Sequence, residues 1–199
     1  MHYKDYKGGD KVILNIIFAI LLSFLFLYIN KKIDYEYEKP MIFIGVSVAL
    51  SIIVSLKLSD KLQGLLITSL FVTLVNIALI DIKYMEIPNT YNAIVLILGV
   101  INMLILKDYS LILTGIISFA LFFIVAIFSK GALGGGDIKL ALGLGLFFNR
   151  LAYIDFLIYT FGIGAVIALI LLVTKKKSKE DKIAFGPFMS LGAILAILV

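Results

Sequence analysis

Long runs of apolar residues, separated by short polar stretches, make up most of the chain. A helix needs roughly 20 apolar residues to cross the hydrocarbon core of a bilayer. Runs that approach or reach this length occupy 12–29, 41–56, 62–80, 91–106, 111–128, 151–173 and 184–199. A shorter run, 138–148, is the eighth segment, and it is either a short helix or part of the following segment.

These runs predict helices, because every backbone N–H and C=O inside a bilayer needs an internal partner and barrel strands alternate in polarity instead. We therefore predict an all-α membrane protein, a polytopic transmembrane helical bundle with about eight apolar segments and six to eight spans. The first run is followed by Asn30, Lys31 and Lys32 and not by a small-residue cleavage site, so we expect it to be a retained anchor.

Composition agrees with this fold class. Hydrophobic residues make up 62% of the chain and charged residues 16%, which is far from the usual balance of a soluble domain. The longest polar connections, 30–40 and 174–183, are about ten residues each and too short to form a core of their own. We expect a single integral-membrane domain over 1–199 and no soluble domain.

The chain lacks the residues that several kinds of catalytic and metal-binding sites need. The chain has no cysteine, and its one histidine, His2, lies in the amino-terminal tail. Disulfide frameworks, thiolate metal sites and Ser-His or Cys-His nucleophiles are therefore excluded, and we expect no metal and no other cofactor. The net charge of +5 does not indicate nucleic acid as a partner, because the lysines lie in short loops beside apolar runs.

The positive charge predicts topology instead. If Asp81 faces the cytoplasm and the eight segments alternate, the loops on that side hold 11 of the 18 Lys and Arg residues. Five of these 11 lie in the stretch TKKKSKEDK. This bias has the sign of the positive-inside rule. We therefore expect the cytoplasmic side to hold loops 30–40, 81–90, 129–137 and 174–183.

Three acidic residues lie at or inside apolar runs, where an ionisable group is costly and therefore a candidate for function. Asp81 ends the run 62–80, where the helix dipole disfavours an anion. Asp137 follows the glycines of GALGGGDIKL and has a structural alternative, because an aspartate there can cap a helix amino terminus. We interpret Asp155 as an interfacial acid that pairs with Arg150.

Asp81 and Asp137 reach the same face of the membrane in this topology. Two close carboxylates do not both ionise readily, so they share a proton near neutrality. One member can then activate water while the other protonates a leaving amine. This is the chemistry of an aspartic protease, and it needs neither a metal nor a cysteine.

Three stretches carry a resemblance to a known family: LIDIKYMEIPNTYN around Asp81, GALGGGDIKLALGLG around Asp137 and AFGPFMSLGA near the carboxyl terminus. They resemble the three characteristic regions of the type IV prepilin leader peptidases. These enzymes are Gly-x-Gly-Asp intramembrane aspartic proteases, related to archaeal preflagellin peptidases and more distantly to presenilin. Gly-x-Gly-Asp alone is a weak signal, but three regions in order over 79–193 of a helical membrane protein form a strong one.

The resemblance implies catalytic roles for Asp81 and Asp137. It also implies supporting positions in the three regions, namely Ile87, Pro88, Asn89, Gly134, Gly136, Lys139, Phe185, Gly186 and Pro187. Glycines at 134 and 136 let the backbone leave regular helix geometry, so that an extended peptide can approach the second aspartate. Close helix packing is the prediction for the remaining glycines of these segments, Gly143, Gly145, Gly162 and Gly164.

The chain departs from the family in two places. Many bacterial members carry a large cytoplasmic domain after the first helix, with paired cysteines that bind zinc, and this domain is associated with N-methylation of the new amino terminus. The matching loop here is only NKKIDYEYEK, so we expect peptidase activity without methyltransferase activity. Ala184 stands where the family often has proline, which affects the local turn and not the chemistry.

We therefore predict an aspartic endopeptidase of the cytoplasmic membrane that removes short basic leaders from type IV prepilin-like precursors. The resemblance implies cleavage after a glycine, just before a hydrophobic helix, at the cytoplasmic face. Its partners are then the lipid bilayer and prepilins or pseudopilins of a pilus, secretion or DNA-uptake apparatus.

Two other hypotheses stay open. A small transporter or proton-coupled channel would use Asp81 and Asp137 as relay groups, although transporters usually place such groups near the midplane in paired repeats. A catalytically silent assembly subunit is the third hypothesis.

Overall fold

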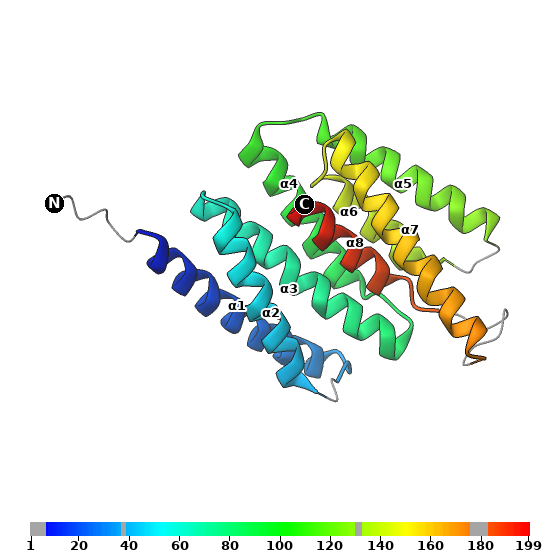
Figure 1. The fold of residues 1–199 in the computed structure, drawn as a ribbon, viewed down its shortest axis with the longest axis horizontal. Coiled ribbons are helices and arrows are strands. Elements are labelled where there is room, and N and C mark those ends of the chain that lie inside the picture. Colours follow the sequence, from blue (N-terminus) through cyan, green and yellow to red (C-terminus); the bar gives the residue numbers. More distant parts are fainter. Residues whose placement is uncertain (1–6, 37–38, 130–132, 176–182) are drawn as a thin grey trace. The chain divides into compact units, whose positions relative to one another are not determined.

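The computed structural model describes residues 7–36, 39–129, 133–175 and 183–199. These residues form eight α-helices (Figure 1): α1 Lys7–Lys32, α2 Pro40–Lys57, α3 Lys61–Tyr84, α4 Asn89–Leu106, α5 Leu111–Phe128, α6 Gly135–Gly145, α7 Arg150–Val173 and α8 Gly186–Leu198. Each predicted segment corresponds to one helix. His2, residues 130–132 and most of the predicted loop 174–183 lie outside the described residues.

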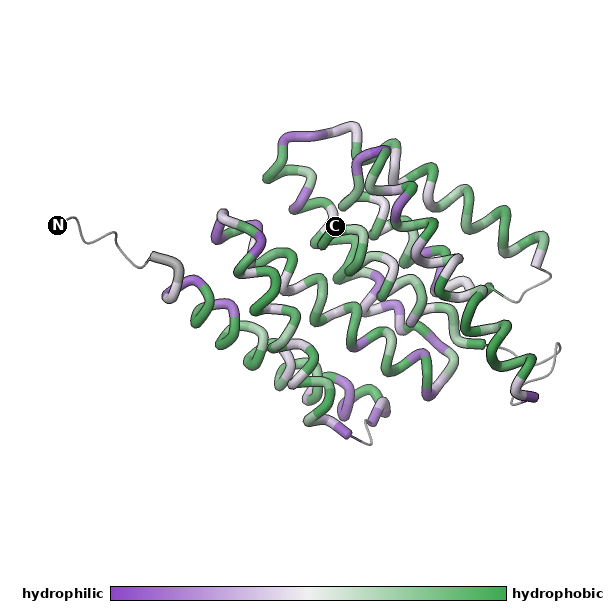
Figure 2. The backbone as a smooth tube through the Cα atoms, in the orientation of Figure 1, coloured by the Kyte–Doolittle hydropathy of each residue, from purple (hydrophilic) through white to green (hydrophobic). Residues whose placement is uncertain are grey.

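Six of these helices are long and apolar enough to cross a membrane: α1, α2, α3, α4, α5 and α7. The other two are shorter, with 11 residues in α6 and 13 in α8. The uncertain run 138–148 is thus a separate short helix, since α6 ends at Gly145 and α7 begins at Arg150. In Figure 2 hydrophobic residues fill most of each helix, in agreement with a lipid environment. The protein is a polytopic all-α membrane protein, as predicted.

The described helices fall into two compact units, Met1–Asn76 and Ile77–Val199, so α3 contributes to both. In the first unit, polar side chains link the helices. The Asn15 amide donates to the Ser55 hydroxyl at 2.7 Å, and the Asn30 amide donates to the Asn76 side-chain oxygen at 2.8 Å. Such bonds favour helix association in a bilayer, where apolar surfaces gain little from leaving lipid.

The second unit is built around the short helix α6, which packs against both α4 and α5 (Figure 1). The Asn102 amide of α4 donates to the Leu146 carbonyl just after α6, at 3.1 Å. Helix α7 packs against α8. Aromatic rings tie α5, α7 and α8 together, with centroids 5.1 to 6.3 Å apart, through Phe122, Phe148, Phe156, Phe161, Phe185 and Phe188.

Three of the four glycines predicted to mediate packing do so. A Cβ atom at Gly145 would stand 2.6 Å from the Gly115 Cα of α5, and one at Gly143 would stand 3.0 Å from the Leu96 nitrogen of α4. A Cβ atom at Gly164 would likewise stand 3.2 Å from the Phe188 ring of α8. The prediction for Gly162 was wrong, because no atom of the described residues lies within 4 Å of a Cβ placed there.

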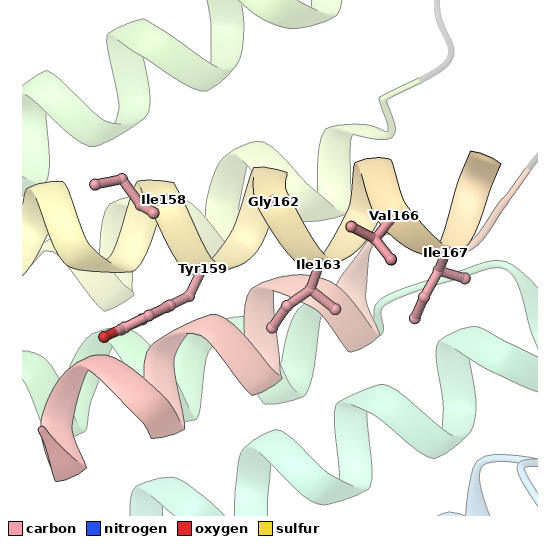
Figure 3. Close-up of a pocket in the computed structure, with 6 residues that line it drawn as sticks. All are labelled: Ile158, Tyr159, Gly162, Ile163, Val166 and Ile167. Carbon is pink, nitrogen blue, oxygen red and sulfur yellow. The ribbon is translucent and has the colours of Figure 1, made fainter. Parts of the chain in front are cut away.

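Gly162 instead lies in an apolar groove of about 340 Å³ along α7 (Figure 3). One helix supplies all the residues that line the groove: Ile158, Tyr159, Gly162, Ile163, Val166 and Ile167. The missing side chain makes a gap between its larger neighbours, and no packing partner of Gly162 fills it.

Candidate active site

Asp81 lies in the last turn of α3 and is 5% exposed. The backbone N–H of Gly186, the first residue of α8, donates to its Oδ2 at 2.8 Å. A Cβ atom at position 186 would stand 2.8 Å from the same oxygen. Glycine is therefore the residue that lets the backbone come this close to the carboxylate. The third motif region thus reaches the first candidate aspartate from 105 residues away.

Asp137 lies in the first turn of α6 and is 7% exposed. Its Oδ2 accepts a hydrogen bond from the Gly134 N–H at 3.0 Å, which is the bond of a carboxylate that caps a helix start. Its Oδ1 is buried and has no partner among the described residues. The capping alternative therefore accounts for one carboxylate oxygen and leaves the other for a different role.

Short contacts hold the loop between α3 and α4 against α6. Met85 has a φ of 55°, in the left-handed region that often ends helices, and its N–H donates to the Asp81 carbonyl at 2.9 Å. Ile87 is buried, and a Cβ atom at Gly136 would stand 2.9 Å from the Ile87 Cβ. Pro88 follows as the N-cap of α4. The first motif region is thereby fixed against the second.

Gly136 departs from the expectation for the motif glycines. It belongs to the first turn of α6 and does not leave helix geometry, so its role is to let Ile87 approach. Gly134 does precede the helix, as an N-cap in extended conformation that any residue can adopt. Close approach, and not unusual backbone geometry, is what these two positions require of glycine in the structure.

A further bond joins the two motif regions at the surface. The Lys139 ammonium donates to the Asn89 side-chain oxygen at 2.8 Å and thereby links α6 to the start of α4. Both residues are exposed. Lys139, which the sequence analysis assigned to the second region, is therefore bonded to Asn89 of the first region.

A pocket of about 290 Å³ gathers most of the candidate residues. Its walls come from the end of α3, the loop to α4, and the start of α6, and they consist of Asp81, Met85, Glu86, Ile87, Asn89, Gly134, Gly135, Gly136, Asp137 and Lys139. Pro88, the N-cap of α4, and Pro187, in the first turn of α8, do not line it. Within the described part of the chain no group of His, Cys, Asp and Glu could hold a metal ion.

The electrostatics of the pocket favour a shared proton. Burial and, to a smaller extent, the negative charge of Asp81 raise the pKa of Asp137 from 3.8 to about 7, against the lowering effect of the N–H groups of Gly134 and of Asp137 itself. Asp137 belongs to α6, which is not one of the six long spans. A carboxyl group with this pKa carries a proton for much of the time at neutral pH and can release or accept it.

Three wall residues were not predicted from the sequence: Met85, Glu86 and Gly135. Met85 and Glu86 line the pocket, yet they lie in a loop. Their position between Asp81 and Pro88 is the only sequence signal that could have indicated them. Asp155 is exposed on α7 and does not line the pocket.

Comparison with known proteins adds one finding. A sequence model of the type IV leader peptidase family matches residues 68–171. The match covers just over half of the 199 residues and includes both candidate aspartates. No curated protein and no solved structure gives a significant match. The family indicated by the motif regions is therefore confirmed.

Proposed function

Since the chain belongs to the type IV leader peptidase family and is a multi-pass membrane peptidase, we propose that Asp81 and Asp137 are its catalytic pair. One observation carries this proposal. The two aspartates line the same pocket, and the Asp137 Oδ1 is buried there without a partner among the described residues. An unpaired buried oxygen is costly to folding, which is expected where a side chain is kept for chemistry.

The proposed reaction is hydrolysis of a peptide bond by an activated water. Asp81 acts as the base and takes a proton from the water, whose oxygen attacks the carbonyl carbon of the scissile bond. Asp137, as the member that carries the shared proton, protonates the leaving nitrogen as the bond to carbon breaks. The Gly186 N–H keeps Asp81 in place, and the Gly134 N–H keeps Asp137 in place. The protons balance, because Asp81 takes one proton from the water and Asp137 gives one proton to the leaving nitrogen.

The proposed substrates are type IV prepilins or pseudopilins, cut after a glycine at the cytoplasmic face of the cytoplasmic membrane. The pocket lies at the ends of helices, where a leader can stay in water while the following hydrophobic helix lies in the bilayer. Residues 1–199 act as one peptidase domain in this proposal. Lys139, Asn89 and the motif glycines support the pair by joining the regions that carry it.

Methylation of the product is not part of the proposed activity. The chain has no cysteine, and its loop 30–40 has about ten residues in place of a cytoplasmic domain. Mass spectrometry of a precursor processed by this protein alone should show an unmodified amino terminus. An added methyl group would contradict this part of the proposal.

Cleavage of a prepilin by the purified protein in detergent tests the catalytic pair. Asp81→Asn and Asp137→Asn should each lower kcat/KM by about 10²–10⁴-fold, the usual share of general acid–base catalysis. The double variant should be little worse than either single one, because residues that act as a unit are not additive. The cleavage rate of the wild type should follow a bell-shaped pH profile, whose two apparent pKa values describe the coupled pair and not either aspartate alone.

Asp155→Asn is the matched control, because it removes the same charge from an exposed position outside the pocket. It should keep wild-type cleavage. Near-normal cleavage by Asp137→Asn would mean that this residue only caps α6. Absence of any cleavage by the wild type, together with proton-coupled transport in vesicles, would favour the transporter hypothesis.

A further inference from the structure

Glu86 is an exposed acid on the wall of the candidate active site. Among the described residues that line this pocket, it is the only carboxylate besides Asp81 and Asp137. It lies five residues after Asp81, in the loop between α3 and α4. Its exposure means that its charge meets whatever enters the pocket from water.

The backbone on both sides of Glu86 is held in place. Met85 donates its N–H to the Asp81 carbonyl at 2.9 Å. Ile87 is 6% exposed and fits between two motif glycines, with 2.9 Å from its Cβ to a Cβ built at Gly136 and 3.2 Å from its Cδ1 to one built at Gly186. The Glu86 carboxylate is therefore displayed from a fixed position at the pocket wall.

The charges of the pocket favour a cation near Glu86. Among the residues of the pocket wall that the structure describes, Lys139 is the only cationic one, and its ammonium donates to Asn89. Lys83, three residues before Glu86, has its ammonium 5.3 Å from the centroid of the Tyr84 ring. With one proton shared by the aspartates, the formal charges on the described part of the pocket wall are those of one aspartate, Glu86 and Lys139. The sum of these charges is negative, and the negative charge of Glu86 is the exposed one.

We propose that Glu86 determines specificity by pairing with a lysine or arginine of the substrate's leader. This inference rests on the proposed function, which supplies a basic leader next to the scissile bond. Complementary charge at the edge of a site selects among partners and speeds their encounter, while contributing modestly to affinity. In this proposal Glu86 selects the peptide that enters the pocket, whereas the two aspartates catalyse hydrolysis of its peptide bond.

A charge-exchange experiment tests the inference. The probes are two precursor peptides that share a glycine and a hydrophobic helix, one with a lysine- and arginine-containing leader and one with glutamates in their place. The wild type should cleave the basic precursor better. Glu86→Gln should lower kcat/KM for the basic precursor by up to about fivefold, the range of exposed ion pairs, mainly through KM. Added salt should reduce this difference, because it screens exposed charges.

Glu86→Lys should reverse the preference, so that it cleaves the acidic precursor better than the wild type does. Asp155→Asn is the control, because it removes one negative charge of the same unit away from the pocket and should leave both substrates unaffected. Melting curves of the variants check that they are folded, as expected for an exposed position.

Each result decides between the two claims. If the wild type and both Glu86 variants cleave both precursors with the same leader preference, the inference about Glu86 is overturned while the proposed peptidase function stands. If the wild type cleaves neither precursor, the proposed function fails and takes the inference with it. Gain of cleavage of the acidic precursor by Glu86→Lys is the result that a merely structural role of Glu86 would not produce.

Discussion

The two oxygens of the Asp137 carboxylate are in different situations. Oδ2 accepts the Gly134 N–H and belongs to the start of α6, whereas Oδ1 is buried without a partner among the described residues. One side chain can therefore stabilise a helix and serve chemistry at once. Sequence alone suggested both roles as alternatives. It could not combine them, because the division depends on where α6 starts, and it starts at Gly135, before the apolar run.

The raised pKa of Asp137 predicts how stability depends on pH. Burial and the charge of Asp81 raise this pKa from 3.8 to about 7. Between these values the folded protein keeps a proton that the unfolded chain has lost, so rising pH favours unfolding. The stabilisation is complete below about pH 4 and is lost by about pH 7. The melting temperature in detergent should therefore fall over this range, and Asp137→Asn should flatten the fall.

The control for this measurement is Asp155→Asn, which should keep the wild-type slope because Asp155 is exposed. Parallel curves for the wild type and Asp137→Asn would mean that Asp137 titrates normally in the folded protein. The direction of the slope is informative by itself, since an aspartate stabilised as an anion would make stability rise with pH.

Among the elements, the glycine-rich helix α6 shows what the sequence can and cannot predict. The small residues Gly143 and Gly145 predicted close packing, and α4 and α5 do pack there. The same argument failed at Gly162 of α7. In a soluble protein the polar face of a helix marks the side without a partner, but beyond Asp155 the helix α7 is largely apolar on every side, because lipid replaces water. The sequence therefore did not indicate which face of α7 is covered.

Matched glycine substitutions test this packing. Gly145→Ala should destabilise the protein by about 1–3 kcal/mol, because a Cβ there would stand 2.6 Å from the Gly115 Cα and 2.9 Å from the Thr114 carbonyl oxygen. Gly162→Ala meets no atom within 4 Å and should stabilise α7 by about 0.5–1 kcal/mol. Thermal unfolding in one detergent measures both. Equal effects of the two substitutions would contradict the assigned packing of α6.

At the scale of the whole molecule, three segments distant in sequence meet around the pocket. The Lys139–Asn89 bond joins residues 50 apart, and the Gly186–Asp81 bond joins residues 105 apart. The sequence predicted that loops 81–90, 129–137 and 174–183 share a side, because lysines and helix order set topology. It could not predict Glu86 or Met85 as wall residues. Their place depends on how Ile87 packs against Gly136, which is a contact between a loop and the start of α6 and not a local pattern.

The orientation of this pocket in the membrane gives the last prediction. Met85 and Gly135 are exposed beside the pocket, while Tyr109 is exposed after the far end of α4. The 18 residues of α4 span about 27 Å, close to the thickness of the hydrocarbon core. The chain has no cysteine, so a single introduced one is the only thiol. In intact cells an impermeant thiol reagent should label Tyr109→Cys, and it should label Met85→Cys and Gly135→Cys only after permeabilisation. The opposite pattern would put the pocket outside the cytoplasm, where a leader that stays in the cytoplasm does not reach it.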